Sequence, residues 1–92
     1  MQKYESMVVI STKLDEEAIK GLVEKFTNLI EANGTMVSVE EWGKRRLAYL
    51  INKEADGYYV LFTFECDAAF PAELDRVYKI TEGLLRTMII AL

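Results

Sequence analysis

A run of three basic residues, Lys44, Arg45 and Arg46, is the most unusual chemical feature of this sequence. The run follows Gly43 and holds three of only eleven lysines and arginines in an acidic chain. A guanidinium binds a phosphate through two parallel hydrogen bonds, and a bent strand would present Lys44 and Arg46 on one side and Arg45 on the other. The run therefore predicts a phosphate-binding stripe. A charged edge strand that resists aggregation would have the same composition, and the residues alone do not decide between the two.

Other basic residues could extend such a stripe. Lys53 follows on the same hairpin, while Arg76, Lys79 and Arg86 come from the last helix and strand, which the fold could bring towards one rim. Fifteen acidic residues against eleven basic ones give a formal net charge of −4, which argues against nonspecific nucleic-acid binding by the whole surface. The charged residues of the stretch 15–31 are mostly acidic. This asymmetry suits a protein that contacts nucleic acid with one edge.

Several enzyme classes lack the residues that they need. The chain has no histidine, which removes the usual general base and the commonest metal ligand, and it has neither a glycine-rich phosphate loop nor a serine elbow. The acidic pairs Glu16-Glu17 and Glu40-Glu41 point apart on a helix or strand and cannot share a substrate atom. We therefore expect no catalytic site, no metal, no cofactor and no small-molecule substrate.

The compartment is predicted from the single cysteine and from the absence of long apolar segments. Cys66 cannot form an internal disulfide, and in an apolar strand it is typical of a structural thiol in a reducing cytoplasm. Residues 1–10 carry Lys3 and Glu5 and an apolar run of only four residues, which is not a signal peptide. No stretch approaches the ~20 apolar residues of a transmembrane helix. We expect a cytoplasmic protein without membrane contact.

Hydrophobic periodicity predicts six elements in the order strand, helix, strand, strand, helix, strand. The strands are expected over 3–11, 35–51, 58–66 and 84–92, and the helices between 15 and 34 and between 67 and 83. Asp15 and Asp67 are predicted to cap the helices, and Gly34 to end the first one in the left-handed conformation. Asp56-Gly57 is a hairpin signal between the two middle strands.

This order is the split βαβ or ferredoxin-like arrangement, an α+β sandwich (βαββαβ) whose four-stranded antiparallel sheet carries two helices on one face. At 92 residues we expect a single domain, residues 1–92. The other sheet face is then open, and alternation places Met7, Val9, Tyr59 and Leu61 on it. A protein partner could cover this apolar patch, whereas base stacking would need more aromatic residues than Tyr59 alone. The fold hosts many functions and does not decide between them.

Three stretches of the chain form a pattern that is specific in residue type and spacing. They are Lys3-Tyr4-Glu5, the segment from Glu40 to Tyr58 with GKRRLAYLIN at 43–52, and Leu84-Leu85-Arg86. This pattern resembles the family of bacterial small-subunit ribosomal protein six over essentially the whole chain. One departure is Leu50, where the family commonly has a proline.

The resemblance implies a structural protein of the small ribosomal subunit and no catalysis. It implies binding to the central domain of 16S rRNA, together with small-subunit ribosomal protein eighteen as a heterodimer, during assembly of the platform. Carried over by position, the residues implied to face RNA are Lys3, Arg45, Arg46, Lys53, Lys79 and Arg86. Their role would be to contact backbone phosphates and to recognise RNA shape, with little base readout.

The residues themselves leave two other functions open. A regulatory ferredoxin-like module would bind a small ligand or self-associate through the open sheet, and a dimer that forms alone and ignores RNA would favour it. A hydrolase of the acylphosphatase type shares the fold but needs an arginine in a phosphate loop after the first strand, where this chain has Ser11-Thr12-Lys13. An acylphosphate turnover assay tests the hydrolase.

Overall fold

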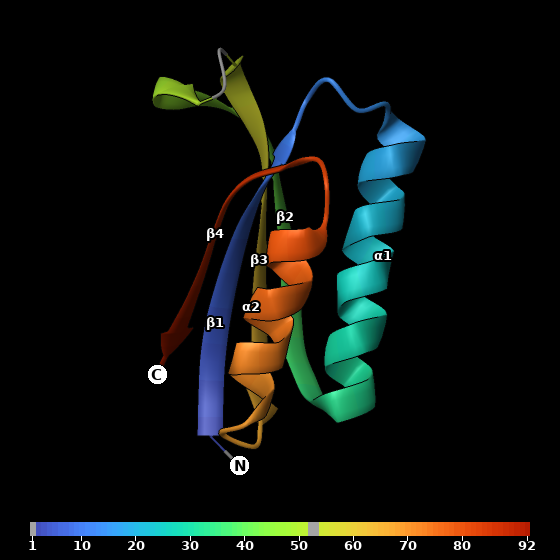
Figure 1. Ribbon diagram of the computed structural model, residues 1–92, viewed down its shortest axis with the longest axis vertical. Coiled ribbons are helices and arrows are strands. Elements are labelled where there is room, and N and C mark those ends of the chain that lie inside the picture. The colour runs from blue at the N-terminus through green and yellow to red at the C-terminus, as the bar shows by residue number, and fades with distance from the viewer. Residues whose placement is uncertain (1, 52–53) are drawn as a thin grey trace.

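The computed structural model describes residues 2–51 and 54–92. Its elements follow one another as β1 (Gln2–Ser11), α1 (Glu16–Asn33), β2 (Gly34–Ile51), β3 (Glu54–Cys66), α2 (Phe70–Ile80) and β4 (Leu84–Ala91). The strands form one antiparallel sheet in the order β2-β3-β1-β4 (Figure 1). This is the βαββαβ order predicted from the sequence, so the predicted fold class is confirmed.

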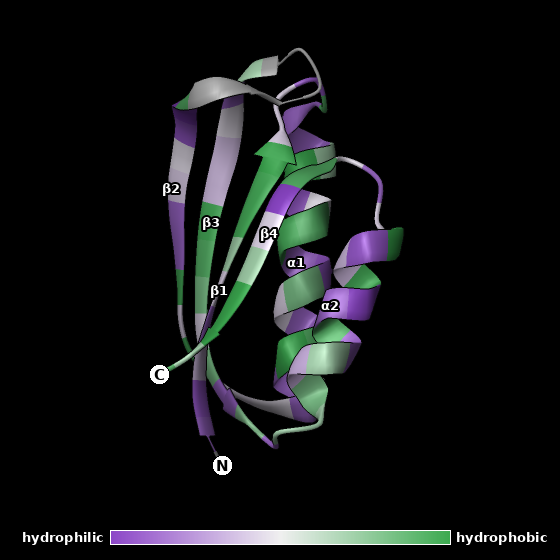
Figure 2. Cartoon of the chain, turned by 60° about the vertical axis from the view of Figure 1, so that its left-hand side comes forward, coloured by the Kyte–Doolittle hydropathy of each residue, from purple (hydrophilic) through white to green (hydrophobic). Residues whose placement is uncertain are grey.

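The core lies between the sheet and the two helices. Because successive residues of a strand point to opposite faces, alternate apolar residues of β1 and β3 meet the apolar stripes of α1 and α2. Figure 2 shows both helices on the same side of the sheet, as predicted. The large side chains buried in this layer are Val8, Ile10, Phe26, Ile30, Val60, Phe62, Phe64, Leu74 and Tyr78.

The first helix begins as predicted and ends differently. Asp15 accepts a hydrogen bond from the Ala18 backbone N–H at 2.8 Å, so it is the N-cap of α1. Gly34 is not a left-handed C-cap, because its backbone is extended and it is the first residue of β2. A Cβ at this position would overlap with the carbonyl oxygen of Glu65 on the neighbouring strand. The glycine is required by this close approach and not by a turn.

The predicted turn at Asp56-Gly57 is wrong. Both residues lie inside β3, where Asp56 pairs with Arg46 and Gly57 with Arg45, and the register of β2 and β3 extends to the pair formed by Ile51 and Glu54. A Cβ on Gly57 would overlap with the side chain of Val9, which explains the glycine without a turn. The two strands are therefore longer than expected, and they project past the helices as an arm (Figure 1).

The second helix also lacks its predicted side-chain cap. Ala69 occupies the N-cap position of α2, and Asp67 contributes its backbone carbonyl, which accepts from the N–H of Phe70 at 3.1 Å. After α2 the chain turns at Gly83, whose φ of 94° favours glycine, and its carbonyl accepts from the N–H of Ser11 at 2.7 Å. This hydrogen bond joins the turn before β4 to the end of β1, next to the strand with which β4 pairs.

Candidate functional site

The face of the sheet opposite the helices, called the open face below, carries an apolar strip across its middle. Met7 pairs with Leu61 on β3 and with Met88 on β4, so these three side chains form one row across the strands. Ile90 lies one step further along β4, and both Met88 and Ile90 are almost half exposed. The sequence predicted Met7 and Leu61 here, and the register adds the β4 residues.

Trp42 also lies on the open face, which sequence reasoning did not foresee. A β-bulge between Glu41 and Gly43 leaves Trp42 as an extra residue in β2, and its indole borders a shallow hollow together with Met7 and Leu61. Trp42 is 43% exposed. Gly43 has φ of 80°, a conformation typical of a bulge, and the glycine beside a tryptophan was the available signal.

Two of the predicted site residues, Arg45 and Arg86, lie at one end of the open face. Arg86 pairs with Val9, which pairs with Tyr59, and Arg45 lies one step further along the edge strand β2. Tyr59 borders one hollow with Arg45 and Trp42 and another with Arg86. The two arginines therefore lie on either side of Tyr59, beside the apolar strip. Such an end combines phosphate-binding charge with aromatic surface.

Arg46 and Lys44 point away from this end, towards the helix side of β2. Lys44 Nζ lies 3.8 Å from the carboxylate of Asp56, an ion pair whose side chains are well exposed, so its contribution is small. Asp56 is the register partner of Arg46, and Arg46 is exposed. The predicted division, with Lys44 and Arg46 on one side and Arg45 on the other, is confirmed. The basic run thus presents cations on both sides of the arm.

Tyr58 adds an anchored hydroxyl to the helix side of the arm. Its Oη donates a hydrogen bond to the carboxylate of Glu41 at 3.0 Å, which ties β3 to β2 next to the bulge. Partial burial, followed by the hydrogen bond and the charge of Glu41, raises the pKa of the Tyr58 phenol. The hydroxyl therefore remains protonated at neutral pH and serves as a donor that holds the bulge in place.

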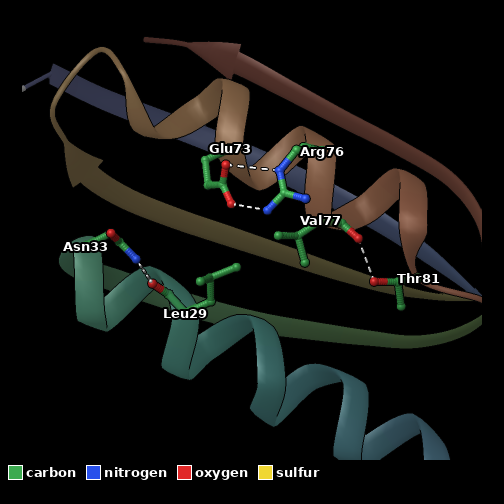
Figure 3. Close-up of polar contacts among 6 residues, drawn as sticks. All are labelled: Leu29, Asn33, Glu73, Arg76, Val77 and Thr81. Atoms are coloured by element: carbon green, nitrogen blue, oxygen red, sulfur yellow. Dashed lines mark hydrogen bonds and ion pairs between the residues drawn. The ribbon is translucent and has the colours of Figure 1, made fainter.

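The basic residues of α2 lie on the other side of the sheet from Arg86. Lys79 Nζ forms an ion pair with Asp75 at 2.9 Å. Figure 3 shows the guanidinium of Arg76 turned onto the carboxylate of Glu73, which it meets through two nitrogens. This hydrogen-bonded pair lowers the pKa of Glu73 and raises that of Arg76. The fold does not bring these side chains onto the face that carries Arg86.

Lys3 lies apart from this end. Lys3 pairs with Glu65 and precedes Val9 by six residues on β1, which places it about 20 Å from the row of Arg86. Lys53 lies outside the described residues. The candidates that the structure describes thus occupy several regions of the surface, and among them Arg45 and Arg86 come together at one end of the open face.

Neither a metal centre nor a membrane helix is found in the part of the chain that the structure describes. Residues 2–51 and 54–92 contain no group of three or more potential metal ligands among cysteine and acidic side chains. Among these residues, no helix combines the length and apolar character needed to cross a membrane.

Comparisons with known proteins identify the family. The model of the family described as ribosomal protein S6 matches residues 3–91. The small ribosomal subunit protein bS6 of Thermoanaerobacter pseudethanolicus is 54% identical over 91 residues, which cover 98% of this chain and 96% of that protein. Its counterpart in Clostridium novyi is 46% identical over the same share of both chains.

A solved structure agrees with these relatives. The crystal structure of 30S ribosomal protein S6 from Thermotoga maritima superposes with a TM-score of 0.95 at 33% sequence identity, and covers 99% of this chain and 87% of that one. The matches extend over the bulged arm as well as the core. The chain therefore belongs to the ribosomal protein S6 family, whose members are structural proteins of the small subunit of the cytoplasmic ribosome and not enzymes.

Proposed function

We propose that this protein binds the central domain of 16S rRNA as a heterodimer with small-subunit ribosomal protein eighteen during assembly of the platform. The observation that carries the proposal is the pair Arg45 and Arg86, which flanks Tyr59 at one end of the open face beside an apolar strip. One end offers charge for phosphates, and the strip offers apolar surface for a protein. A joint protein and RNA surface needs both.

The RNA contact is supported by where the positive charge lies. The chain has a formal net charge of −4, so phosphate binding depends on local groups of cations and not on the whole surface. Arg45 and Arg46 point to opposite sides of the arm. Because β2 is the edge strand of the sheet, a nucleic-acid backbone that runs along this edge would contact both side chains. The other residues expected to contribute are Lys3, Lys53, Lys79 and Arg86.

The ion pair of Lys79 does not oppose a role in RNA binding. Lys79 and Asp75 are both exposed to solvent, with 73% and 43% of their side chains accessible. Exposed pairs of this kind contribute about 0–1 kcal/mol, so the ammonium group can exchange the carboxylate for a phosphate at little cost.

The protein contact is supported by the apolar strip. Met7, Leu61 and Met88 lie on the open face together with the exposed Trp42 and Ile90. Exposed apolar surface of this kind, bordered by charged residues, is typical of a protein interface. We assign the strip to protein eighteen and the arginine end to the rRNA.

Binding of a central-domain rRNA fragment, with and without protein eighteen, over a series of salt concentrations tests the proposal. We expect salt-sensitive binding that requires protein eighteen. Arg46→Glu should weaken binding and reduce the slope of log affinity against log salt by about one, because one phosphate contact releases about one counterion. Arg45→Glu should act in the same way.

Lys20→Glu is the matched control, because it makes the same charge change at an exposed position of α1 outside the candidate set. It should leave the salt slope unchanged. Equal affinities for wild type and a folded Arg46→Glu variant would remove Arg46 from the RNA contact. No binding under any condition would overturn the proposed function.

A further inference from the structure

Trp42 and Tyr59 border the same hollow at the arginine end of the open face. The hollow has a volume of about 390 Å³, and Arg45 also lines it. Gly43 pairs with Tyr59 in the register of β2 and β3, and Trp42 is the extra residue of the bulge just before this glycine. β2 therefore places no side chain opposite Tyr59, and a Cβ at Gly43 would meet no atom within 4 Å. The bulge thus adds a second aromatic residue to a face for which the sequence predicted Tyr59 alone.

We propose that this hollow binds one unpaired nucleotide of RNA, whose base stacks against Trp42 and Tyr59 and whose phosphate binds Arg45. The proposal names the ligand of the surface that the proposed function assigns to rRNA, and its role in the ribosome rests on that function. A base inside a duplex is already stacked on its neighbours, so aromatic side chains select bases that are unpaired. A site for duplex phosphates would need cations and no aromatic rings.

One edge of the Tyr59 ring lies next to the row of Arg45. Gly57 is the register partner of Arg45, and a Cβ at this glycine would lie 3.7 Å from the Tyr59 ring. Arg45 is exposed, and no ion pair of this residue is found among the side chains that the structure describes. A base that lies on the ring therefore brings its phosphate close to a guanidinium group that does not first have to leave a carboxylate.

A second hollow, which Trp42 borders in the direction of Glu5, has the opposite charge. Apart from Trp42, its lining combines one carboxylate with aliphatic and thioether side chains. These residues are Glu5, Met7, Leu61, Met88 and Ile90. A carboxylate repels a phosphate, whereas Arg45 on the other side of Trp42 attracts one. This contrast favours the Arg45 side for the nucleotide and leaves the apolar strip to a protein partner.

The two arginines of the open face suggest a path for the RNA across the sheet. Arg45 lies on the edge strand β2 and Arg86 on the opposite edge strand β4, with Tyr59 on β3 between them. Three strand spacings, about 14 Å, separate the two edges. A single-stranded segment that runs from one arginine to the other therefore passes over Tyr59, which borders a further hollow with Arg86. Arg86 takes part in another interaction within the chain, so we assign the main phosphate contact to Arg45.

Tryptophan fluorescence tests the contact directly, because Trp42 is the single tryptophan of the chain. We expect titration of the protein with hexauridylate to quench this fluorescence, since a stacked base contacts the indole. Inorganic triphosphate supplies charge without a base, and a short RNA duplex supplies a backbone without unpaired bases, so neither should quench. Absence of quenching by hexauridylate up to millimolar concentration, or equal quenching by either control probe, would overturn the site.

Aromatic and aliphatic replacements separate stacking from packing. Trp42→Leu and Tyr59→Leu should each lower the affinity for labelled hexauridylate, measured by fluorescence anisotropy, by about tenfold. Trp42→Phe and Tyr59→Phe are the matched controls, because they retain a ring, and they should stay within about threefold of the wild type. Thermal unfolding of each variant is recorded first. Leucine variants that bind like the wild type, or phenylalanine variants that lose as much affinity as the leucine variants, would overturn the stacking.

The complex with protein eighteen and the central-domain rRNA fragment completes the experiment. We expect Tyr59→Leu to form the heterodimer within about threefold of the wild-type affinity and to bind the rRNA about tenfold more weakly. A weaker heterodimer with unchanged rRNA affinity would assign the hollow to protein eighteen and overturn the nucleotide site. Wild-type rRNA affinity in both leucine variants would also overturn the site and leave the proposed function standing. Quenching by hexauridylate in a protein that binds no rRNA under any condition would do the reverse.

Discussion

The hydroxyl groups of Ser6 on β1 and Tyr78 on α2 form a hydrogen bond of 2.6 Å inside the apolar core. Ser6 is fully buried and Tyr78 is 2% exposed. The tyrosine ring packs edge-on against Phe26 of α1, with ring centroids 4.9 Å apart. One side chain thus joins the central strand to both helices. The bond satisfies both hydroxyls, which would otherwise be buried without a partner.

Tyr78→Phe should lower the free energy of unfolding by about 1–2 kcal/mol, because it leaves the Ser6 hydroxyl buried and without its partner. Urea denaturation measures the change. The double variant Ser6→Ala/Tyr78→Phe should lose less than the sum of the two single variants, since neither hydroxyl then remains unsatisfied. Additive losses would mean that the two hydroxyls do not interact in solution.

Stability should fall in alkaline solution because of the same tyrosine. Burial raises the pKa of Tyr78 above its ordinary value of 10.0. The hydrogen bond with Ser6 lowers this pKa to a smaller extent, and the nearby charge of Asp75 raises it. The folded state holds the phenol proton more tightly than the unfolded state does. The raised pKa therefore contributes to the free energy of unfolding in full below pH 10, and this contribution decreases as the pH rises further. The slope is at most about 1.4 kcal/mol per pH unit.

Tyr78→Phe provides the control for this pH dependence, because it removes one titrating group and leaves the lysines and Tyr58 unchanged. The difference in unfolding free energy between wild type and variant should be constant from pH 7 to about 9.5 and should shrink above pH 10. A difference that stays constant to pH 11 would contradict the raised pKa.

Two glycines should respond to alanine in opposite directions. Gly57→Ala should destabilise the protein by about 1–3 kcal/mol, because the new Cβ overlaps with the stiff, β-branched side chain of Val9. Gly21→Ala on α1 meets no atom within 4 Å and should stabilise by about 0.5–1 kcal/mol through helix propensity. Thermal unfolding measures both. A neutral Gly57→Ala variant would mean that the two strands separate easily at this point.

The thiol of Cys66 should resist modification while the protein is folded. The residue is buried where β3 ends, and burial, together with the charge of Asp67, raises the pKa of the thiol. Labelling with a disulfide reagent at pH 8 should be slower than in urea by about 10³-fold or more, because it requires opening of the structure. Comparable rates in both conditions would show an accessible thiol.

The order of the elements and the inward face of β3 could be predicted because they depend on local periodicity. Alternation of Val60, Phe62 and Phe64 identifies a core face without any knowledge of the neighbours. The errors at Gly34 and Gly57 share one cause. Glycine signals a turn in sequence statistics, whereas here it permits close approach of another strand. That approach depends on residues distant in the chain.

The candidate site was predictable in part for the same reason. The run Lys44-Arg45-Arg46 is continuous in sequence, and its division between two faces follows from alternation. The meeting of Arg45, Arg86 and Tyr59 depends instead on the register of three strands, which no local pattern determines. Trp42 was missed because its position depends on a bulge.

The two irregularities of β2 have a combined effect on the phase of the strand. After Met36, the extra residue Val37 exchanges the faces of odd and even positions, and the extra residue Trp42 exchanges them back. The phase is therefore inverted only in the middle of the strand, and the arginine end alternates as though β2 were regular. If either extra residue were paired regularly, with the pairing of Gly34 retained, Lys44 and Arg46 would turn towards the open face in place of Arg45. Two local insertions thus decide which arginine the open face presents.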